Sequence, residues 1–160
     1  MGLMISDHRM ALNFLWRGVA SLALCLIAFW AGLAGYWTAQ REPPIRVESV
    51  ELLTPEVPAG GTVRVRHTTT RFDPCHLTLE RSIIDAGGVL FRLEDVSFSA
   101  GRVSVGAEEP FIETTPVPPG MRPGTARLRE ILVHTCNPVH RFWPVTQRMP
   151  DIQFRVTPEN

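Results

Sequence analysis

The segment Gly18–Gln40 contains 23 residues and no charged side chain. At about 1.5 Å per residue, a helix of this length matches the roughly 30 Å hydrocarbon core of a bilayer. A helix buried in a soluble protein would normally show a polar face, and this segment has none. Aromatic residues flank it, as they do at membrane interfaces. The sequence predicts a transmembrane helix over residues 18–40, with interface anchors at Trp16, Tyr36 and Trp37.

A cleaved signal peptide is the main alternative to a permanent anchor. The Gly32-x-Ala34 motif offers a cleavage site that would leave Gly35 as the first residue. The apolar run is longer than the roughly 7–15 residues of an ordinary signal sequence, which favours the anchor. A lipoprotein is not expected, because Leu24 stands where a lipobox has a small residue before its cysteine.

Small side chains recur along one face of the expected helix at steps of three and four residues. Such seams let helix backbones approach closely in lipid, so we expect this face to pack against a second copy or another membrane helix. The alternative is that alanine and glycine are simply common in such helices. The seam consists of Gly18, Ser21, Cys25, Ala28, Gly32 and Gly35.

The chain divides at the prolines that follow the apolar run. Residues 1–17 are expected to form a short cytoplasmic tail, and residues 41–44 an extended linker, because consecutive prolines end a helix. Residues 45–160 are then the extracytoplasmic domain. From Arg41 onward, 14 arginines face 15 acidic residues, and this balance gives no electrostatic footprint for nucleic acid.

After the linker the hydrophobic period becomes two, and turn signals recur about every ten residues. This pattern is typical of an all-β sandwich or barrel. Seven strands are predicted, at Ile45–Leu53, Thr62–Arg71, Cys75–Ile84, Val89–Phe98, Phe111–Val117, Thr125–Thr135 and Ile152–Val156.

The last strands resemble an immunoglobulin-like or fibronectin-III-like module. The resemblance covers residues 45–158 and rests on the strand pattern and on the Pro123–Gly124 lead-in to Ala126-Arg127-Leu128-Arg129. It implies a seven-stranded immunoglobulin-like β-sandwich behind one transmembrane α-helix. The tryptophan typical of antibody domains is absent from the third predicted strand.

Cys75 and Cys136 lie at the edges of two predicted strands. In a small exported domain they are most simply a disulfide, closing a loop of about 60 residues with a stabilisation on the order of 4 kcal/mol. An oxidised pair places the domain in the periplasm of a bacterium, with the N-terminus cytoplasmic and the helix in the inner membrane. The alternative is a metal site at His134, Cys136 and His140 with His67 or His76, but this spacing matches no closed zinc pattern, and no metal is expected.

The block Cys136–Pro144 holds the only tryptophan outside the apolar head. Aromatic and arginine residues on a rigid loop are typical of interface anchors, so we expect a partner-binding loop. The alternative is that the aromatic rings cap the open end of the sandwich. The block also resembles one in small uncharacterised membrane-anchored proteins of bacteria and their phages. Its expected contact residues are Pro138, His140, Arg141, Phe142 and Trp143.

Outward strand positions carry several arginines. They suit either anionic lipid headgroups or, in the simpler interpretation, a solvated sheet face paired with glutamates. The arginines are Arg64, Arg66, Arg127, Arg129 and Arg155, and the glutamates are Glu48, Glu80 and Glu130.

No nucleophile, zinc-protease, phosphate-loop or dinucleotide motif is present, so an enzyme and a cofactor are not expected. The sequence predicts a non-catalytic interaction or accessory subunit of a membrane or envelope assembly. Its partners would be the lipid bilayer and either another protein or a second copy, and no nucleic acid. Two alternatives stay open: a phage or prophage envelope protein for lysis or superinfection exclusion, and a secreted carbohydrate- or metal-binding domain with a cleaved signal.

Overall fold

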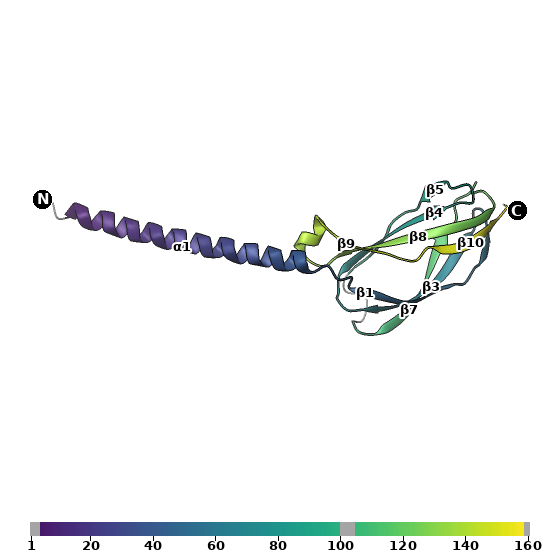
Figure 1. Ribbon diagram of the computed structural model, residues 1–160, viewed down its shortest axis with the longest axis horizontal. Helices are drawn as coiled ribbons and strands as arrows, with labels where there is room; N and C mark the ends of the chain where they lie inside the picture. The colour runs from purple at the N-terminus through teal and green to yellow at the C-terminus, as the bar shows by residue number, and fades with distance from the viewer. Residues whose placement is uncertain (1–3, 100–104, 159–160) are drawn as a thin grey trace. The chain divides into compact units, whose positions relative to one another are not determined.

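The computed structural model describes residues 4–99 and 105–158, with side chains from residue 12 onward. Two compact units are present, Met1–Gln40 and Arg41–Asn160, and each is described by itself. The first is helical, and the second consists of two β-sheets and one short 3-10 helix (Figure 1).

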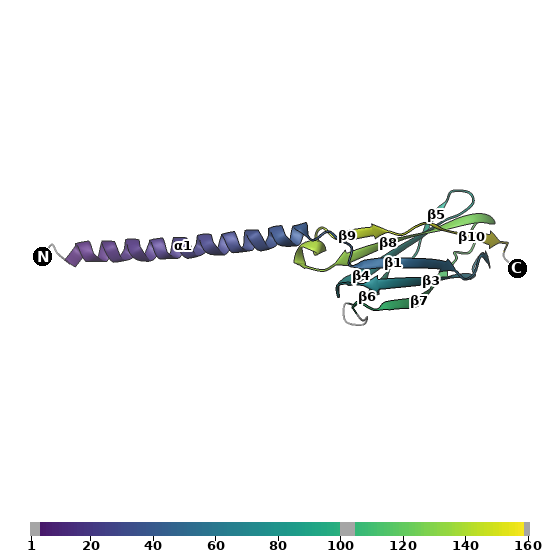
Figure 2. The ribbon, with the colours of Figure 1, turned by 60° about the horizontal axis from the view of Figure 1, so that its bottom comes forward.

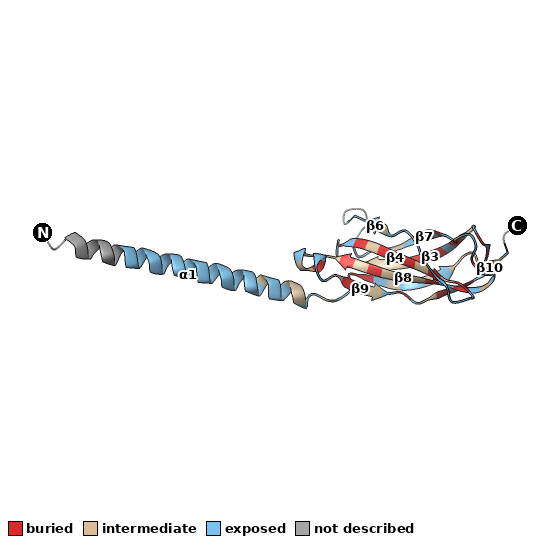
Figure 3. Ribbon diagram, turned by 90° about the horizontal axis from the view of Figure 1, so that it is seen from above, coloured by how far each residue is buried: buried red, intermediate tan, exposed pale blue. Residues whose placement is uncertain are grey.

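Helix α1 spans Met4–Ala39 and therefore begins well before the predicted start at Gly18. Its stretch Leu12–Ala39 is long and apolar enough to cross a membrane, and none of its most apolar window is buried within the protein. Figure 3 shows this exposure along the helix. An apolar surface with no protein cover requires another apolar environment. A signal sequence can have the same length and composition, so the expectation that this helix is a permanent anchor rather than a cleaved signal stays a prediction.

The smaller sheet has the strand order β1-β3-β7, and Figure 2 shows these strands side by side. All of its pairings are antiparallel. The strands are β1 (Ile45–Leu52), β3 (Thr62–Arg71) and β7 (Glu108–Pro116).

The larger sheet has the order β2-β10-β8-β4-β5, with β6 paired to β4 and β9 paired to β8. Among the described strands of this sheet, the pairing of β10 with β2 is the one that is parallel. The strands are β2 (Glu56–Pro58), β4 (His76–Ile84), β5 (Leu90–Arg92), β6 (Val96–Phe98), β8 (Gly124–Thr135), β9 (Val145–Arg148) and β10 (Ile152–Thr157).

The expectation of a β-rich domain with two sheets behind one apolar helix is confirmed, but the described residues hold ten strands rather than seven. The predicted strand Val89–Phe98 is split into β5 and β6. Strands β2 and β9 were missed because three or four residues are too few to show a period. Strands β4 and β5 form an antiparallel hairpin, and its turn needs a glycine because Gly88 has a φ of 81°.

Alternation along the strands builds an apolar core between the sheets. Val63 and Val65 of β3 point inward, whereas the alternating residues Arg64 and Arg66 are exposed. Figure 3 shows the same alternation along β4 and β8. What we call the first apolar cluster joins both sheets and contains Val57, Ala59, Val63, Val65, Ile83, Val117, Met121, Ala126, Leu128, Ile152, Phe154 and Val156. The second apolar cluster contains Ile45, Leu77, Leu79, Leu132 and Met149.

The predicted disulfide is present between Cys75 and Cys136, with 4.4 Å between their Cα atoms. The two cysteines flank paired strands: His76 of β4 is in register with Thr135 of β8. The bond therefore clamps neighbouring strands at one end of their ladder, although the cysteines are 61 positions apart in sequence.

Candidate functional site

A layer of polar side chains lies between the two apolar clusters. Along β4, Arg81 stands between Leu79 of the second cluster and Ile83 of the first. Along β8, Glu130 stands between the corresponding leucines, Leu128 and Leu132. The smaller sheet contributes the facing side chains. We call His67, Arg81, Glu113, Thr115 and Glu130 the buried polar layer, and each is at most 9% exposed.

One carboxylate oxygen in the layer is held firmly. Arg81 donates from Nη1 to Oε1 of Glu113 at 3.1 Å, and Thr115 donates to the same oxygen at 2.9 Å. Arg81 also donates to the backbone carbonyl of Glu94 at 2.9 Å. These bonds pair the buried guanidinium with a carboxylate and connect the two sheets, since Arg81 belongs to β4 and Glu113 to β7.

The opposite side of the layer is not bonded in this way. Nε2 of His67 lies 3.3 Å from Oε2 of Glu113 and 3.7 Å from Oε2 of Glu130, without hydrogen-bond geometry to either. Both oxygens of Glu130 also have no hydrogen-bond partner within the described residues. Buried polar atoms in proteins are nearly always bonded, so an imidazole and two carboxylates that face one another without bonds are unusual.

The two carboxylates have different proton affinities. Burial raises the pKa of Glu130, and the negative charge of Glu113 raises it further. Burial also acts to raise the pKa of Glu113, but interactions with His67, Glu130, Thr115 and Arg81 outweigh burial and lower it. At neutral pH the layer therefore favours one charged carboxylate, paired with Arg81, beside one protonated carboxyl.

An apolar cavity of about 190 Å³ adjoins the layer. His67, Glu113 and Glu130 contribute to its wall, and the rings of Phe98 and Phe111 lie at its partly exposed side. The remaining wall is mostly apolar and includes Ile45, Val47, Leu77, Leu79, Leu132 and Met149. The cavity has room for a few water molecules or a small ligand. The imidazole of His67 and the carboxyl groups of Glu113 and Glu130 lie at one side of it.

The prediction that Glu130 pairs with arginines on a solvated face is wrong, because Glu130 is only 1% exposed. The signal was present in the sequence. Glu130 is in phase with inward Leu128 and Leu132, and His67 is in phase with inward Val63 and Val65. Charged and polar residue types suggested that these side chains face solvent. The period of two along each strand indicates instead that they face the interior, and the structure agrees with the period.

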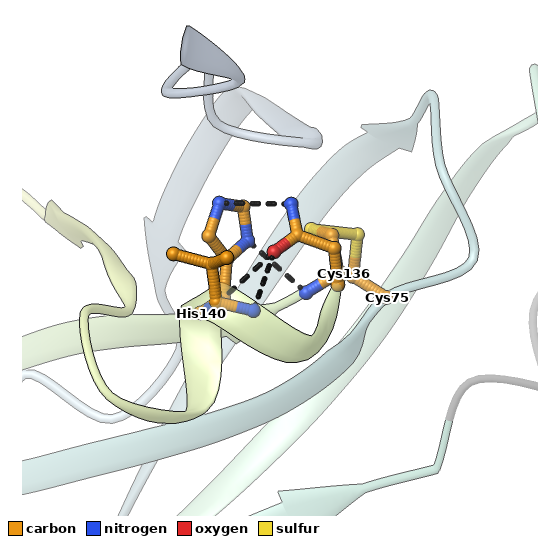
Figure 4. The surroundings of a disulfide bond; sticks show 5 residues. Cys75, Cys136 and His140 are labelled. Atoms are coloured by element: carbon orange, nitrogen blue, oxygen red, sulfur yellow. Dashed lines mark hydrogen bonds between the residues drawn. A yellow bond between two sulfur atoms is a disulfide. The ribbon is translucent and has the colours of Figure 1, made fainter. Parts of the chain in front are cut away.

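The Cys136–Pro144 block is organised by Asn137 and His140. The side chain of Asn137 accepts from the backbone N–H groups of Val139 and His140, which begins the 3-10 helix η1 (Pro138–Arg141). His140 is buried, and its Nδ1 accepts from the backbone N–H of Cys136 at 3.3 Å (Figure 4). His140 therefore shapes the loop from within, beside the disulfide, rather than presenting itself to a partner.

Two other expected contact residues of this loop are open to solvent. Phe142 is 92% exposed and Trp143 is 56% exposed, so they do not cap the sandwich as the alternative interpretation held. The guanidinium of Arg41 lies 4.0 Å from the centre of the Trp143 ring and donates to the Trp143 carbonyl at 3.0 Å. The tryptophan is thus fixed to the first residue of the β-domain, while Phe142 projects freely.

The alternative metal site at His134, Cys136 and His140 is excluded. Cys136 is in the disulfide, and Nδ1 of His140 is occupied by a backbone N–H group. His134 points into the interior, where burial lowers its pKa to about 4, with Arg71 adding to the shift and Gln147 opposing it.

The predicted helix-packing residues lie on the open surface of α1. A Cβ added at Gly18, Gly32 or Gly35 would meet no other atom within 4 Å, apart from the helix's own backbone. Trp16 and Tyr36 are also exposed. The exposure of these residues does not test helix packing or anchoring, so the seam and the interface anchors stay predictions.

Comparisons with known proteins give distant likenesses to solved structures. No family model and no curated protein matches the chain. The C-terminal domain of Wzt is 18% identical with a TM-score of 0.48, over 74% of this chain and 77% of that one. The Pseudomonas fluorescens alkylpurine DNA glycosylase AlkC, bound to DNA containing an abasic site analog, is 12% identical with a TM-score of 0.45; the alignment covers 72% of this chain and 31% of that one.

Spo0M, a sporulation control protein from Bacillus subtilis, is 14% identical with a TM-score of 0.36, over 74% of this chain and 51% of its own. The chain thus spans about a third of the glycosylase and half of Spo0M. At these identities and scores the likenesses carry no argument about activity.

Proposed function

We propose that this protein is a membrane-anchored accessory subunit that binds a neighbouring envelope protein through Phe142 and Trp143. Helix α1 would hold the chain in a bacterial inner membrane, and the β-domain would lie in the periplasm as an immunoglobulin-like sandwich. The observation that carries the proposal is the pair of exposed aromatic rings on a loop fixed by the disulfide, by Asn137 and by His140. Exposed aromatic side chains on a preorganised loop favour binding because little conformational freedom is lost.

Chain connectivity limits where this partner would lie. Arg41 contacts Trp143 and is separated from the last residue of α1, Ala39, only by Gln40. Two residues reach at most about 7 Å, so Trp143 would lie near the point where the chain leaves the bilayer. The proposed partner is therefore another membrane protein with a periplasmic part close to the membrane surface.

Membrane attachment and orientation are tested first. After carbonate washing the chain is expected in the membrane pellet, with an intact N-terminus by mass spectrometry. Cys75 and Cys136 should resist alkylation until a reductant is added, because an oxidised pair indicates a periplasmic domain. Release by carbonate, or free thiols at both positions in native cells, would contradict the proposal.

Partner binding is tested by crosslinking from the loop. A photo-reactive residue at position 142 should give a defined crosslinked species, and Trp143→Ala with Phe142→Ala should abolish co-purification in mild detergent. Arg155→Ala, on an exposed strand position away from the loop, is the matched control and should retain the partner. Crosslinks to lipid alone, or an unchanged yield of the partner in the double variant, would reject protein binding at this loop.

A further inference from the structure

We propose that His67, Glu113 and Glu130 bind a divalent transition-metal cation between the two sheets. The inference does not depend on the accessory role proposed above, because a metal site would serve an accessory subunit and an exported binding domain equally well. It concerns the buried polar layer, not the exposed loop.

The spacing of the three side chains fits a small cation. Nitrogen or oxygen ligands lie about 2.0–2.2 Å from a zinc ion, so two ligands of a tetrahedron are separated by roughly 3.3–3.6 Å. Nε2 of His67 is 3.3 Å from Oε2 of Glu113 and 3.7 Å from Oε2 of Glu130. One ligand atom from each residue lies within 4.8 Å of the other two. A cation of this size fits among them with little movement of the side chains.

The lack of hydrogen bonds around these atoms points to a ligand. His67 is 2% exposed and Glu130 is 1% exposed, yet neither His67 Nε2 nor the oxygens of Glu130 form a hydrogen bond within the described residues. A buried polar atom without a partner costs about 1–3 kcal/mol. Metal coordination would satisfy the lone pairs of all three side chains at once, and it would release the proton that otherwise neutralises one carboxyl.

Arg81 and Thr115 supply the support that a metal ligand needs. Both donate to Oε1 of Glu113 and leave its Oε2 facing His67. Ligating carboxylates are commonly held in this way by a second group, which fixes the oxygen that faces the metal. Without a cation the layer keeps one carboxyl protonated. A divalent cation would displace that proton, and its charge would balance two ionised carboxylates beside the single positive charge of Arg81.

The donor set selects the class of metal. An imidazole nitrogen is a good ligand for zinc and its first-row neighbours, whereas magnesium and calcium prefer six or more oxygens. Three protein ligands leave a coordination position free, and all three side chains line the apolar cavity. The site therefore has the composition of an open transition-metal site, with room for a small ligand on the cavity side.

Metal binding by the full-length chain in detergent is the test. Cys25→Ser serves as the background for every variant, because Cys25 is a free and exposed thiol that would bind metal by itself. After treatment with a chelator, the protein is titrated with Zn²⁺ by calorimetry and with Co²⁺ by visible absorption. We expect one equivalent of either ion, a Co²⁺ absorption spectrum of low-symmetry nitrogen and oxygen ligands, and a higher melting temperature in the presence of Zn²⁺.

Two variants locate the site, and a third controls for surface histidine. Glu130→Gln and His67→Asn should lower the affinity for Zn²⁺ by at least about 100-fold. Glu130→Gln keeps the size of the side chain and is expected to stay folded, as a cooperative melting transition would report. His76→Asn removes an exposed histidine from β4 and should leave the affinity unchanged.

Three outcomes would overturn the proposal. The first is the absence of binding by the folded starting protein at millimolar Zn²⁺. The second is an unchanged affinity in folded Glu130→Gln, and the third is a loss of binding in His76→Asn. In the first case His67, Glu113 and Glu130 do not form a metal site. Membrane extraction and crosslinking at position 142 are read separately, so failure here does not reject the accessory role, nor does failure there reject the metal site.

Discussion

The first apolar cluster and the buried polar layer are made from the same strands by the same alternation, but they hold the sheets together differently. In the cluster, Val63, Ile83 and Leu128 make non-directional apolar contacts. Each contributes to the free energy of folding in proportion to the apolar area that it buries. In the layer, the guanidinium of Arg81 bonds particular atoms of Glu113 and Thr115. Substitutions in the first apolar cluster should therefore lower the free energy of unfolding in proportion to the volume removed. In the buried polar layer, the loss of a single side chain should cause a large drop.

Removal of Arg81 gives the largest expected effect. Arg81→Met leaves Glu113 buried without its cation, and breaking one side of such a pair typically costs about 3–5 kcal/mol. The measurement is the free energy of unfolding by urea with the disulfide intact. Arg92→Met is the control, because the Arg92–Asp95 pair is exposed and such pairs contribute little.

The double variant Arg81→Met with Glu113→Leu sharpens the same contrast. Replacing both members with apolar groups should recover much of the loss, since the uncompensated charge is then gone. If the single and double variants lose equal stability, the layer acts through packing alone, and the proposed difference between layer and cluster is wrong.

Truncation in the first apolar cluster comes next. Leu128→Ala removes a fully buried side chain and should cost about 3 kcal/mol through lost burial and the remaining cavity. Leu128→Met, which nearly conserves volume, should cost less than about 1.5 kcal/mol. If Leu128→Met lowers the free energy of unfolding as much as Arg81→Met does, the first apolar cluster is as sensitive to the shape of its side chains as the buried polar layer is to its bonds.

His134 offers a comparison based on pH, because it is a buried titratable residue of β8 that lies outside the buried polar layer. Burial lowers the pKa of His134 in the folded protein to about 4, below the ordinary histidine value of 6.5. The unfolded chain therefore binds the extra proton first, and His134 disfavours folding as the pH falls from about 6.5 towards 4. The loss reaches a few kcal/mol, since one pKa unit corresponds to about 1.4 kcal/mol.

The measurement is the free energy of unfolding of wild type and His134→Leu between pH 7 and pH 4. The difference between the two curves should move in favour of the variant as the pH falls, independently of the carboxylates that both proteins share. The exposed His76→Asn variant should follow wild type. Parallel curves for wild type and His134→Leu would mean that the buried imidazole becomes protonated without cost.

The sequence allowed the helix, the disulfide and most strand positions to be predicted, because each depends on local information. Residues 18–40 show their length and lack of charge directly, and Thr62–Arg71 matches β3 at both ends. Cys75 and Cys136 were the two cysteines left outside the apolar segment. These features needed no knowledge of which strands pair.

The polar layer required that knowledge. Each of its side chains is in the inward phase of its own strand, so burial was predictable from period alone. The meeting of His67 from β3 with Glu113 from β7 and Glu130 from β8 was not, since it depends on two sheets packing face to face. Residue type also misled, because a lone glutamate on a strand is usually solvated, and the period of two has to be weighed against that tendency.

Thr115 provides the smallest expected effect and the finest contrast between cluster and layer. Thr115→Val keeps the volume but removes the hydroxyl that donates to Glu113 at 2.9 Å, so the carboxylate loses one bond and keeps Arg81. We expect a loss of about 1–2 kcal/mol in the free energy of unfolding, because hydrogen bonds to charged groups are worth somewhat more than neutral ones. Thr114→Val, at the exposed neighbouring position of β7, should be neutral or slightly stabilising, since β-branched apolar residues suit strands. If Thr115→Val is equally neutral, the buried polar layer tolerates the loss of one hydrogen bond as readily as the first apolar cluster tolerates Leu128→Met. Arg81 alone would then keep the carboxylate of Glu113 in position.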